Sequence, residues 1–492
     1  MSGAVPYLAS RGARNSVRQL LDEAGYREDR IRLLLGTTSI AEALCTSPLV
    51  LERRAGGDSR LEVLIRLFLG GFELARHELV ACLGAAAVEV LEESRLIEPA
   101  AVGLRSTVQL SPIQSLVIAS DRRDRHAQKA ADFVLGAGPV SRLLADLTIR
   151  RPVQSTLDLC CGSGVLGLLA AGHSERVAAV DLSPRAVSFS RFNADLNGLD
   201  AVETAVGDLF EPVRGRRFDL IVCNPPFVIS PASTFLYRDG GSQVCERIVG
   251  EAPAHLTENG CLEMLCNWPE EKGKDWRAGI AGWFEGSGCD AWVLRHQSLA
   301  APDYAAVWLL QEFGDGQIPA ESFAAWMAHL NSLDIESVGT GLVVMRPARG
   351  RTPWLEFRDS PPILAGGAGD SIARTLAARD LAARLPSAEE MLEGRLRPSP
   401  DLERLARDHP TGEGWDPTGL ELRLTRGLCF SARVDPVAAA LVGLLDGRRT
   451  VREAVSIFAD RHGVPPELFL GDAPRAVRNL LQLGLLVPAD EC

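Results

Sequence analysis

The chain has 492 residues, 46% of them hydrophobic, and its formal net charge at pH 7 is −12. This length exceeds what one hydrophobic core organises, so we expect roughly two to four globular domains. No apolar run reaches the roughly 18 residues that span a bilayer and the first residues lack a signal-peptide core, so the sequence predicts a cytoplasmic protein with no membrane partner.

The negative charge also argues against a broad surface for binding polyanions, because nucleic-acid domains usually carry a basic face. A negative net charge is still compatible with local basic patches on the surface. The 11 cysteines include no C-x-x-C pair, so the sequence predicts no metal site.

The first 115 residues have the pattern of a small helical domain. Apolar positions with helical spacing predict helices over 13–35, 59–71 and 76–91, and alternation over 102–110 and 115–119 predicts a hairpin. Helices followed by a hairpin indicate a winged-helix-like domain, which can bind nucleic acid or pack against protein. Acidic residues around the expected recognition helix make nucleic-acid contact by this domain the less favoured alternative.

A charged run follows at 120–130, SDRRDRHAQKA, and is typical of a solvated loop. Because it directly precedes the first strand of the next domain, Asp124, Arg125 and His126 are also candidates for substrate contact.

The segment 155–181 predicts a nucleotide-type pocket. An apolar strand over 156–159 leads through a turn of small residues into a helix over 165–171, and a second strand over 177–180 ends on Asp181. Glycines in such a turn let the backbone approach a ligand, and an acid after the next strand can accept hydrogen bonds from a ribose diol.

Two ligands compete for this pocket. Gly162, Gly164 and Gly167 satisfy the G-x-G-x-x-G pattern of dinucleotide sites, which alone is weak evidence. Asp158, just before the turn, would repel a pyrophosphate but suits the ammonium group of S-adenosylmethionine. With the motif that follows a later strand, this acid favours S-adenosylmethionine.

That later motif is Asn224-Pro225-Pro226-Phe227, which follows an apolar strand over 220–223. Alone it is a good turn sequence. At the end of a strand of this sheet, the Asn224 side-chain oxygen and the Pro225 carbonyl can accept the N–H groups of a planar nitrogen and aim its lone pair at a methyl group. Pro226 has no N–H that competes, and Phe227 offers a ring face for stacking.

Strands and helices alternate onward from Val153, which predicts an α/β domain with a mostly parallel sheet and ligands beyond the carboxyl ends of its strands. We expect further strands over 260–267, 291–296, 306–311 and 340–346, and helices over 187–197, 246–255 and 322–333. The segment 237–241, Tyr-Arg-Asp-Gly-Gly, is either a substrate-facing loop or a connector.

A Gly/Pro-rich break follows Ala348. Beyond it the pattern predicts helices over 371–384, 387–394, 434–445, 450–462 and 473–483, and a strand over 422–430. Together they indicate a second winged-helix-like, mainly helical domain. The predicted domains are therefore 1–115, 116–348 and 349–492.

The central motifs resemble class I S-adenosylmethionine-dependent methyltransferases of the small-domain type, which include release-factor glutamine and rRNA guanine-N2 methyltransferases. The resemblance covers about 116–346 and implies a Rossmann-like sheet of seven strands with the last one antiparallel. The first glycine of the family's loop is Cys160 here, and a cysteine fits that position if its φ is negative. The resemblance implies donor-binding residues at Asp158, Cys160, Gly162, Gly164, Asp181, Leu182, Asp208, Leu209 and Asn224.

The sequence thus predicts an S-adenosylmethionine-dependent N-methyltransferase whose catalytic residues are Asn224, Pro225, Pro226 and Phe227. A base in RNA is the first candidate acceptor, and a protein glutamine or a small metabolite is the alternative. A non-catalytic binding module that keeps the donor fold is a further alternative, which the intact motif residues disfavour. The pattern carries no signal for an oligomeric state.

Overall fold

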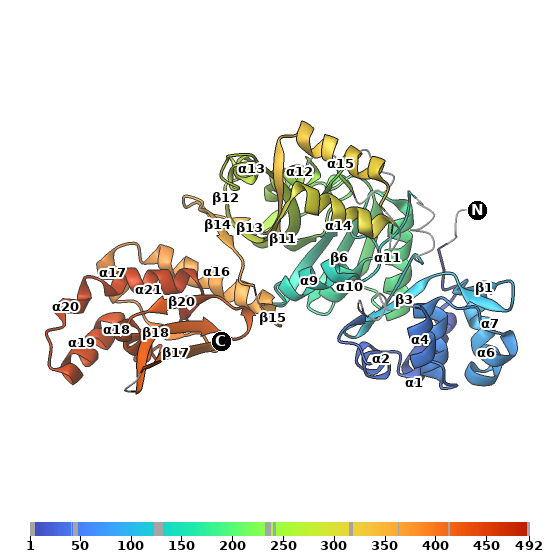
Figure 1. Ribbon diagram of the computed structural model, residues 1–492, viewed down its shortest axis with the longest axis horizontal. Helices are drawn as coiled ribbons and strands as arrows, with labels where there is room; N and C mark the ends of the chain where they lie inside the picture. Colours follow the sequence, from blue (N-terminus) through green and yellow to red (C-terminus); the bar gives the residue numbers. More distant parts are fainter. Residues whose placement is uncertain are drawn as a thin grey trace. The chain divides into compact units, whose positions relative to one another are not determined.

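The computed structural model describes residues 5–40, 42, 48–122, 131–231, 238–239, 243–313, 318–362, 364–411 and 414–489 (Figure 1). The chain divides into two compact units, one of residues 1–145 and 151–358 and the other of 146–150 and 359–492. The substrate-contact candidates Asp124, Arg125 and His126 lie outside the described residues, as does most of the segment 237–241.

The described residues contain no helix with the length and apolar character needed to cross a membrane.

The N-terminal part of the first unit is helical and ends in two hairpins. Its elements are α1 Arg11–Ala24, α2 Glu28–Leu35, α4 Pro48–Arg54, α5 Arg60–Leu64, the π-helix η1 Ile65–Gly70, α6 Arg76–Leu83, α7 Ala85–Glu93, β1 Ile97–Pro99, β2 Leu104–Ser106, β3 Gln109–Ile113 and β4 Leu116–Ser120.

Local chemistry explains where these elements break. The helix predicted over 13–35 is two helices, because Gly25, with φ 66°, ends α1 in the left-handed conformation. The helix predicted over 76–91 is also two, since Gly84 has φ 94° between α6 and α7. The single predicted hairpin is two antiparallel pairs, β1 with β2 and β3 with β4.

The rest of the first unit is an α/β domain. Its elements up to the fourth large strand are α9 Pro139–Leu147, β5 Val153–Leu159, α10 Val165–Ala170, β6 Ser174–Asp181, α11 Pro184–Asn197, β7 Val202–Val206, the 3-10 helix η2 Glu211–Val213 and β8 Phe218–Cys223. They continue as β9 Val228–Ile229, β10 Arg238–Asp239, α12 Gln243–Glu251, η3 Ala252–His255, β11 Leu256–Glu271, α13 Ala278–Ala281, η4 Gly282–Phe284, β12 Cys289–Ala300, α14 Ala301–Phe313, α15 Ala320–Ser332, β13 Ile335–Pro347 and β14 Leu355–Asp359.

One mixed sheet organises this domain, with the strand order β14-β12-β13-β11-β8-β5-β6-β7. The neighbours β7, β6, β5, β8 and β11 run parallel, while β13 is antiparallel to both β11 and β12. The class I methyltransferase sheet with an antiparallel last strand is therefore confirmed, and β14 joins its edge as an eighth strand. Because β5, β6 and β8 are parallel neighbours, the turns that follow them meet at one edge of the sheet.

The sequence prediction is wrong at 306–311, which is not a strand but part of the helix α14. Its buried residues Ala301, Tyr304, Ala305 and Leu309 follow helical spacing. A short apolar run such as Ala-Val-Trp-Leu-Leu fits a strand or a buried helix equally well by periodicity. The strand β7 was not predicted, because its residues alternate only weakly between buried and exposed positions.

The N-terminal part and the α/β domain share a hydrophobic core. Val17, Leu20 and Leu21 of α1 belong to the same buried cluster as Phe189 and Phe192 of α11. Helix α11 therefore packs against the sheet through β6 and β7 and also against α1.

The second unit has its own core. Its elements are β15 Leu364–Ala365, α16 Ala368–Arg384, α17 Ala388–Leu392, β16 Leu396–Pro398, β17 Leu402–Thr411, β18 Gly414–Leu424, β19 Gly427–Leu428, β20 Ser431–Val434, α18 Pro436–Val442, α19 Val451–His462, α20 Glu467–Leu470, α21 Ala473–Gln482 and β21 Leu486–Pro488. The five predicted helices are present, and β17, β18 and β20 form an antiparallel sheet of which only part of β18 was predicted. Buried side chains of α16, α17, α19 and α21 fill the core.

Candidate active site

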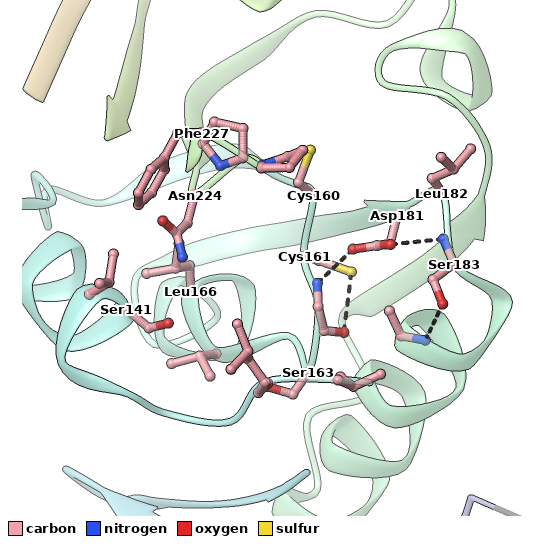
Figure 2. Close-up of a pocket in the computed structure, with 18 of the residues that line it drawn as sticks. Ser141, Cys160, Cys161, Ser163, Leu166, Asp181, Leu182, Ser183, Asn224 and Phe227 are labelled. Atoms are coloured by element: carbon pink, nitrogen blue, oxygen red, sulfur yellow. Dashed lines mark hydrogen bonds between the residues drawn. The ribbon is translucent and has the colours of Figure 1, made fainter. Parts of the chain in front are cut away.

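A cavity of about 310 Å³ lies at the carboxyl ends of β5, β6, β7 and β8 (Figure 2). This volume is within the range of small-molecule sites, which is about 300–1,000 Å³. Most of the predicted site residues line it, namely Cys160, Gly162, Asp181, Leu182, Asp208, Leu209, Asn224, Pro225, Pro226 and Phe227. The structure thus brings together residues from four strand ends that are up to 67 positions apart in the sequence.

Asp181, the last residue of β6, is held by the backbone. Its Oδ2 accepts the N–H of Gly162 at 2.8 Å and its Oδ1 accepts the N–H of Ser183 at 2.8 Å (Figure 2). Burial raises the pKa of this carboxyl, and the two backbone N–H groups oppose that shift. Each oxygen keeps a further lone pair, so the carboxylate can accept hydroxyl hydrogens from a ligand in the cavity.

The turn after β5 is more strained than the sequence predicted. Cys160 has φ 57°, so the condition under which a cysteine would fit this position, a negative φ, is not met. Its backbone takes the left-handed conformation, which a glycine adopts without strain but a residue with a Cβ does not. Gly162 also has a positive φ, 55°, and among the described residues no atom lies within 4 Å of the position that a Cβ would take.

Asp158 and Gly164 do not line the cavity, so their contact with a donor stays a prediction. Asp158 is 1% exposed, and its Oδ2 accepts the N–H of Gly167 at 2.7 Å. Burial raises its pKa to about 7, the Gly167 N–H lowers it, and the charge of Asp181 raises it. Gly164, the residue just before α10, has φ 82°, and a Cβ there would lie 2.5 Å from Ser190 Oγ on α11. In this structure both residues fix the shape of the turn without lining the cavity.

The Asn-Pro-Pro-Phe segment forms the wall of the cavity that follows β8. Within the described part of the chain, the Asn224 Oδ1 atom is buried and has no hydrogen-bond partner. Such an atom costs about 1–3 kcal/mol unless a ligand or water satisfies it. Figure 2 shows the Asn224 amide between the Phe227 ring and Leu166, on the cavity side of the turn. The geometry leaves an acceptor oxygen ready for an N–H donor.

Asp208 and Leu209 border another side of the cavity, after β7. Asp208 is half-exposed and accepts a hydrogen bond from Arg247 Nη2 of α12 at 2.8 Å. Leu209 is buried with φ 46°. Leu182, next to Asp181, is 61% exposed and forms an apolar rim.

Further residues of the cavity were not predicted from the sequence. The segment 133–136 lines it and is fixed by two hydrogen bonds, from the Val134 N–H to Asp121 Oδ2 at 2.9 Å and from Ser163 Oγ to the Leu135 carbonyl at 2.8 Å. The sequence signal that could have identified this segment is its run of apolar residues shortly after the charged run 120–130. Trp308 and Gln311 of α14 also line the cavity, and their mistaken assignment to a strand concealed them.

Comparisons with known proteins agree with this geometry. Residues 138–273 match the family described as "Methyltransferase small domain", and residues 23–107 and 379–488 match two families described as "Domain of unknown function", DUF7059 and DUF7782. The chain therefore contains a methyltransferase small domain with further segments on both sides, which confirms the resemblance predicted from the motifs.

Curated relatives carry the names of methyltransferases with different acceptors. The chain is 42% identical over 126 residues to "Ribosomal protein uL3 glutamine methyltransferase" of Bradyrhizobium diazoefficiens, which covers 22% of this chain and 40% of the relative. It is 35% identical over 111 residues to "Ribosomal RNA small subunit methyltransferase C" of Alcanivorax borkumensis, covering 23% of this chain and 31% of the relative. It is 37% identical over 91 residues to "Release factor glutamine methyltransferase" of Chlamydia trachomatis serovar D, covering 18% of this chain and 31% of the relative.

The chain thus spans two fifths or less of the length of these relatives.

Proposed function

We propose that the protein is an S-adenosylmethionine-dependent N-methyltransferase that acts on a planar amine or amide nitrogen. The observation that carries the proposal is the buried Asn224 Oδ1, which lines the cavity without a hydrogen-bond partner among the described residues. It lies in the cavity that Asp181 and the turn after β5 border from the other side.

The cavity residues fit the methyl donor. Asp181, anchored by Gly162 and Ser183, would accept the ribose hydroxyls, and Asp208 with Leu209 would border the adenine. Gly162 and Cys160 would lie along the ribose and the methionine part. Asp158 would reach the donor's ammonium group through water, since it lies behind the turn.

When bound, S-adenosylmethionine would supply an electrophilic methyl group: the acceptor nitrogen's lone pair would form the new C–N bond, the C–S pair would stay on sulfur as S-adenosylhomocysteine, and the proton lost from nitrogen would pass to water.

The residues of this chain act on the acceptor nitrogen. Its lone pair is delocalised into a planar π system, so the nitrogen is a weak nucleophile. Asn224 Oδ1 and the Pro225 carbonyl would accept its N–H groups, favour a pyramidal nitrogen whose lone pair is no longer delocalised, and stabilise the positive charge that grows on nitrogen. Phe227 contributes the surface against which the planar group is held.

A base in RNA is the first acceptor that we propose, in line with the name of the rRNA methyltransferase among the relatives. A protein glutamine is the second, and one observation favours it: the described residues that line the cavity include Asp181 and Asp208 but no lysine or arginine. A polyanion would need such cations close to its phosphates. Either acceptor, as a component of the translation apparatus, would place the protein in the cytoplasm.

We also propose the division into domains 1–115, 116–348 and 349–492. Its support is that each part contains one of the three matched segments.

Transfer of a radiolabelled methyl group into a cell extract tests the proposal. The extract is separated into RNA, protein and small molecules after incubation with the protein and labelled donor. Label in the RNA or in the protein identifies the acceptor class, and label in small molecules supports the metabolite alternative. Absence of label from every fraction contradicts the proposed activity.

Isothermal titration with S-adenosylmethionine separates an enzyme from a domain that has lost its donor site. We expect binding, and a titration without heat at high donor concentration would contradict the proposed donor site.

A further inference from the structure

The helix α14 approaches the cavity from the side opposite the donor residues. It follows β12 and packs against β12 and β13, beyond β11 in the sheet, whereas Gly162 and Asp181 follow β5 and β6. The strand β8, which leads into Asn224, lies between these two groups of strands. Figure 1 shows α14 and α15 together on this part of the sheet. Residues of α14 that line the cavity therefore lie on the side away from the proposed donor residues, which we call the acceptor side.

One face of α14 carries three aligned residues, two of which line the cavity. Tyr304, Trp308 and Gln311 are spaced by four and three positions, so they lie on the same helix face. Tyr304 is 1% exposed, Trp308 is partly buried, and Gln311 is exposed, while Trp308 and Gln311 both line the cavity. This face runs from the core to the mouth of the site.

Hydrogen bonds tie this face to the catalytic turn. Tyr304 Oη accepts the N–H of Ile229 at 3.0 Å and the Nδ2 group of Asn267 at 2.9 Å. Ile229 belongs to β9, directly after the Asn-Pro-Pro-Phe segment, and Asn267 Oδ1 accepts a hydrogen bond from Thr340 Oγ1 at 2.8 Å. The Trp308 ring packs against Tyr304, with centroids 6.2 Å apart at 67°. Trp308 therefore has a defined position relative to Asn224.

We infer that α14 forms the acceptor-side wall of this site. Trp308 stacks on the planar group that is methylated, and Gln311 forms hydrogen bonds at the mouth of the cavity with the part of the acceptor next to that group. The inference rests on the proposed function and adds two specificity-determining residues to it. An indole face binds a flat, π-conjugated group of any of the proposed acceptors. The competing role for Trp308, stacking on the donor's adenine, is disfavoured because the proposed adenine contacts, Asp208 and Leu209, follow β7, at the opposite edge of the sheet from β12 and β13.

The test compares Trp308→Ala and Trp308→Phe with Leu310→Ala, which removes a 52% exposed side chain from the same helix. The probes are S-adenosylmethionine, for the dissociation constant by titration calorimetry, and the extract fraction that the parent protein labels, for kcat and KM. We expect Trp308→Ala to bind the donor within about twofold of the parent but to raise KM for the acceptor fraction by about tenfold. Trp308→Phe should recover part of this loss, and Leu310→Ala should match the parent.

An unchanged KM in Trp308→Ala, or a loss of donor binding in place of acceptor affinity, would overturn the inference while leaving the proposed function intact. A parent protein that labels no fraction would overturn both. If Trp308→Ala does not fold, Gln311→Ala is the second variant: its exposed side chain can be removed without loss of packing, and we expect a KM increase of about threefold at unchanged donor affinity. A parental KM in Gln311→Ala would likewise overturn the inference.

Discussion

At the scale of single residues, the strongest prediction concerns Asn224. Replacing it by alanine removes the buried Oδ1 acceptor and leaves the carboxylate and backbone around Asp181 untouched. We expect the Asn224→Ala variant to keep its affinity for S-adenosylmethionine within a few fold and to lose about 10²–10³ in kcat, the usual loss for a preorganised polar group. Single-turnover rates with labelled donor measure the second effect and titration calorimetry the first.

Asn331→Ala, at the exposed end of α15, is the matched control and should retain the parental rate. Parental turnover in Asn224→Ala would discard the role given to the motif.

Asp158 should make stability depend on pH. Burial raises its folded-state pKa to about 7, above the value of 3.8 expected in the unfolded chain, so the folded protein holds the proton more tightly. Its contribution to stability is therefore full below pH 4 and is lost as the pH rises to about 7, by roughly 2–3 kcal/mol between pH 5 and pH 8. Asp158→Asn cannot titrate and removes this slope.

Melting temperatures of the donor-free parent and the Asp158→Asn variant, measured at pH 5 and pH 8, check the sign. The parent should lose stability relative to the variant at the higher pH. Asp29→Asn is the control, because the carboxyl of Asp29 is 71% exposed. Its melting temperature should change with pH as that of the parent does. If the melting temperature of the parent instead rose relative to that of Asp158→Asn as the pH rises, burial would not control the pKa of this carboxyl.

Cys160 stores backbone strain that a glycine would release. At φ 57° a residue with a Cβ is disfavoured by about 1–2 kcal/mol relative to glycine. We expect Cys160→Gly to raise the free energy of unfolding by about 1 kcal/mol, while Cys160→Ala, which keeps the Cβ, should not. Thermal unfolding of both variants measures the difference, and equal effects of alanine and glycine would assign the change to the lost thiol.

At the scale of secondary-structure elements, one hydroxyl, that of Tyr304, links α14 by hydrogen bonds to the segment after the proposed catalytic turn. Tyr304→Phe keeps the ring against Trp308 but leaves the buried N–H of Ile229 and the Nδ2 group of Asn267 without this acceptor. We expect a loss of about 1–3 kcal/mol in stability and a fall in kcat larger than any change in donor affinity. Thermal unfolding and transfer rates check this. Stability loss with a parental kcat would limit Tyr304 to a packing role.

The elements that carry the donor turn could be predicted from the sequence, and α14 could not. Strands β5, β6 and β8 are buried apolar runs followed by glycines, an acid or prolines, so local chemistry marks both their positions and their ends. The run at 306–311 contains the same kinds of residue, but its length fits either a strand or a helix. Only packing against β12, β13 and α15 makes it helical, and that information is not local.

The same limit applies to β17. Its sequence carries charged and polar residues on most positions and reads as a loop, yet it pairs with β18 over ten residues. Backbone hydrogen bonds to a partner strand, which the sequence pattern does not reveal, stabilise it.

At the scale of the whole first unit, the proposed domains 1–115 and 116–348 share one hydrophobic core. Helix α1 packs its buried side onto α11, and Arg14 of α1 forms ion pairs with Asp195 of α11 and with Asp200 at 3.0 Å. A further ion pair joins the two parts: Arg142 of α9 pairs with Glu28 of α2 at 2.7 Å. The two proposed domains therefore pack together through one core, which a pattern of helix signals alone could not show.

A shared core predicts that damage to α1 weakens the donor-binding domain as well. Leu20 is 6% exposed in this core, so Leu20→Ala should cost about 2–5 kcal/mol, whereas Leu33→Ala on α2, at an 82% exposed position, should cost little. If both parts unfold together, the transition that Leu20→Ala lowers is the one that S-adenosylmethionine raises, because a ligand that binds only the folded state stabilises the whole cooperative unit. Differential scanning calorimetry with and without donor tests this: a donor that shifts one transition while Leu20→Ala shifts another would show that α1 belongs to a separately folding part.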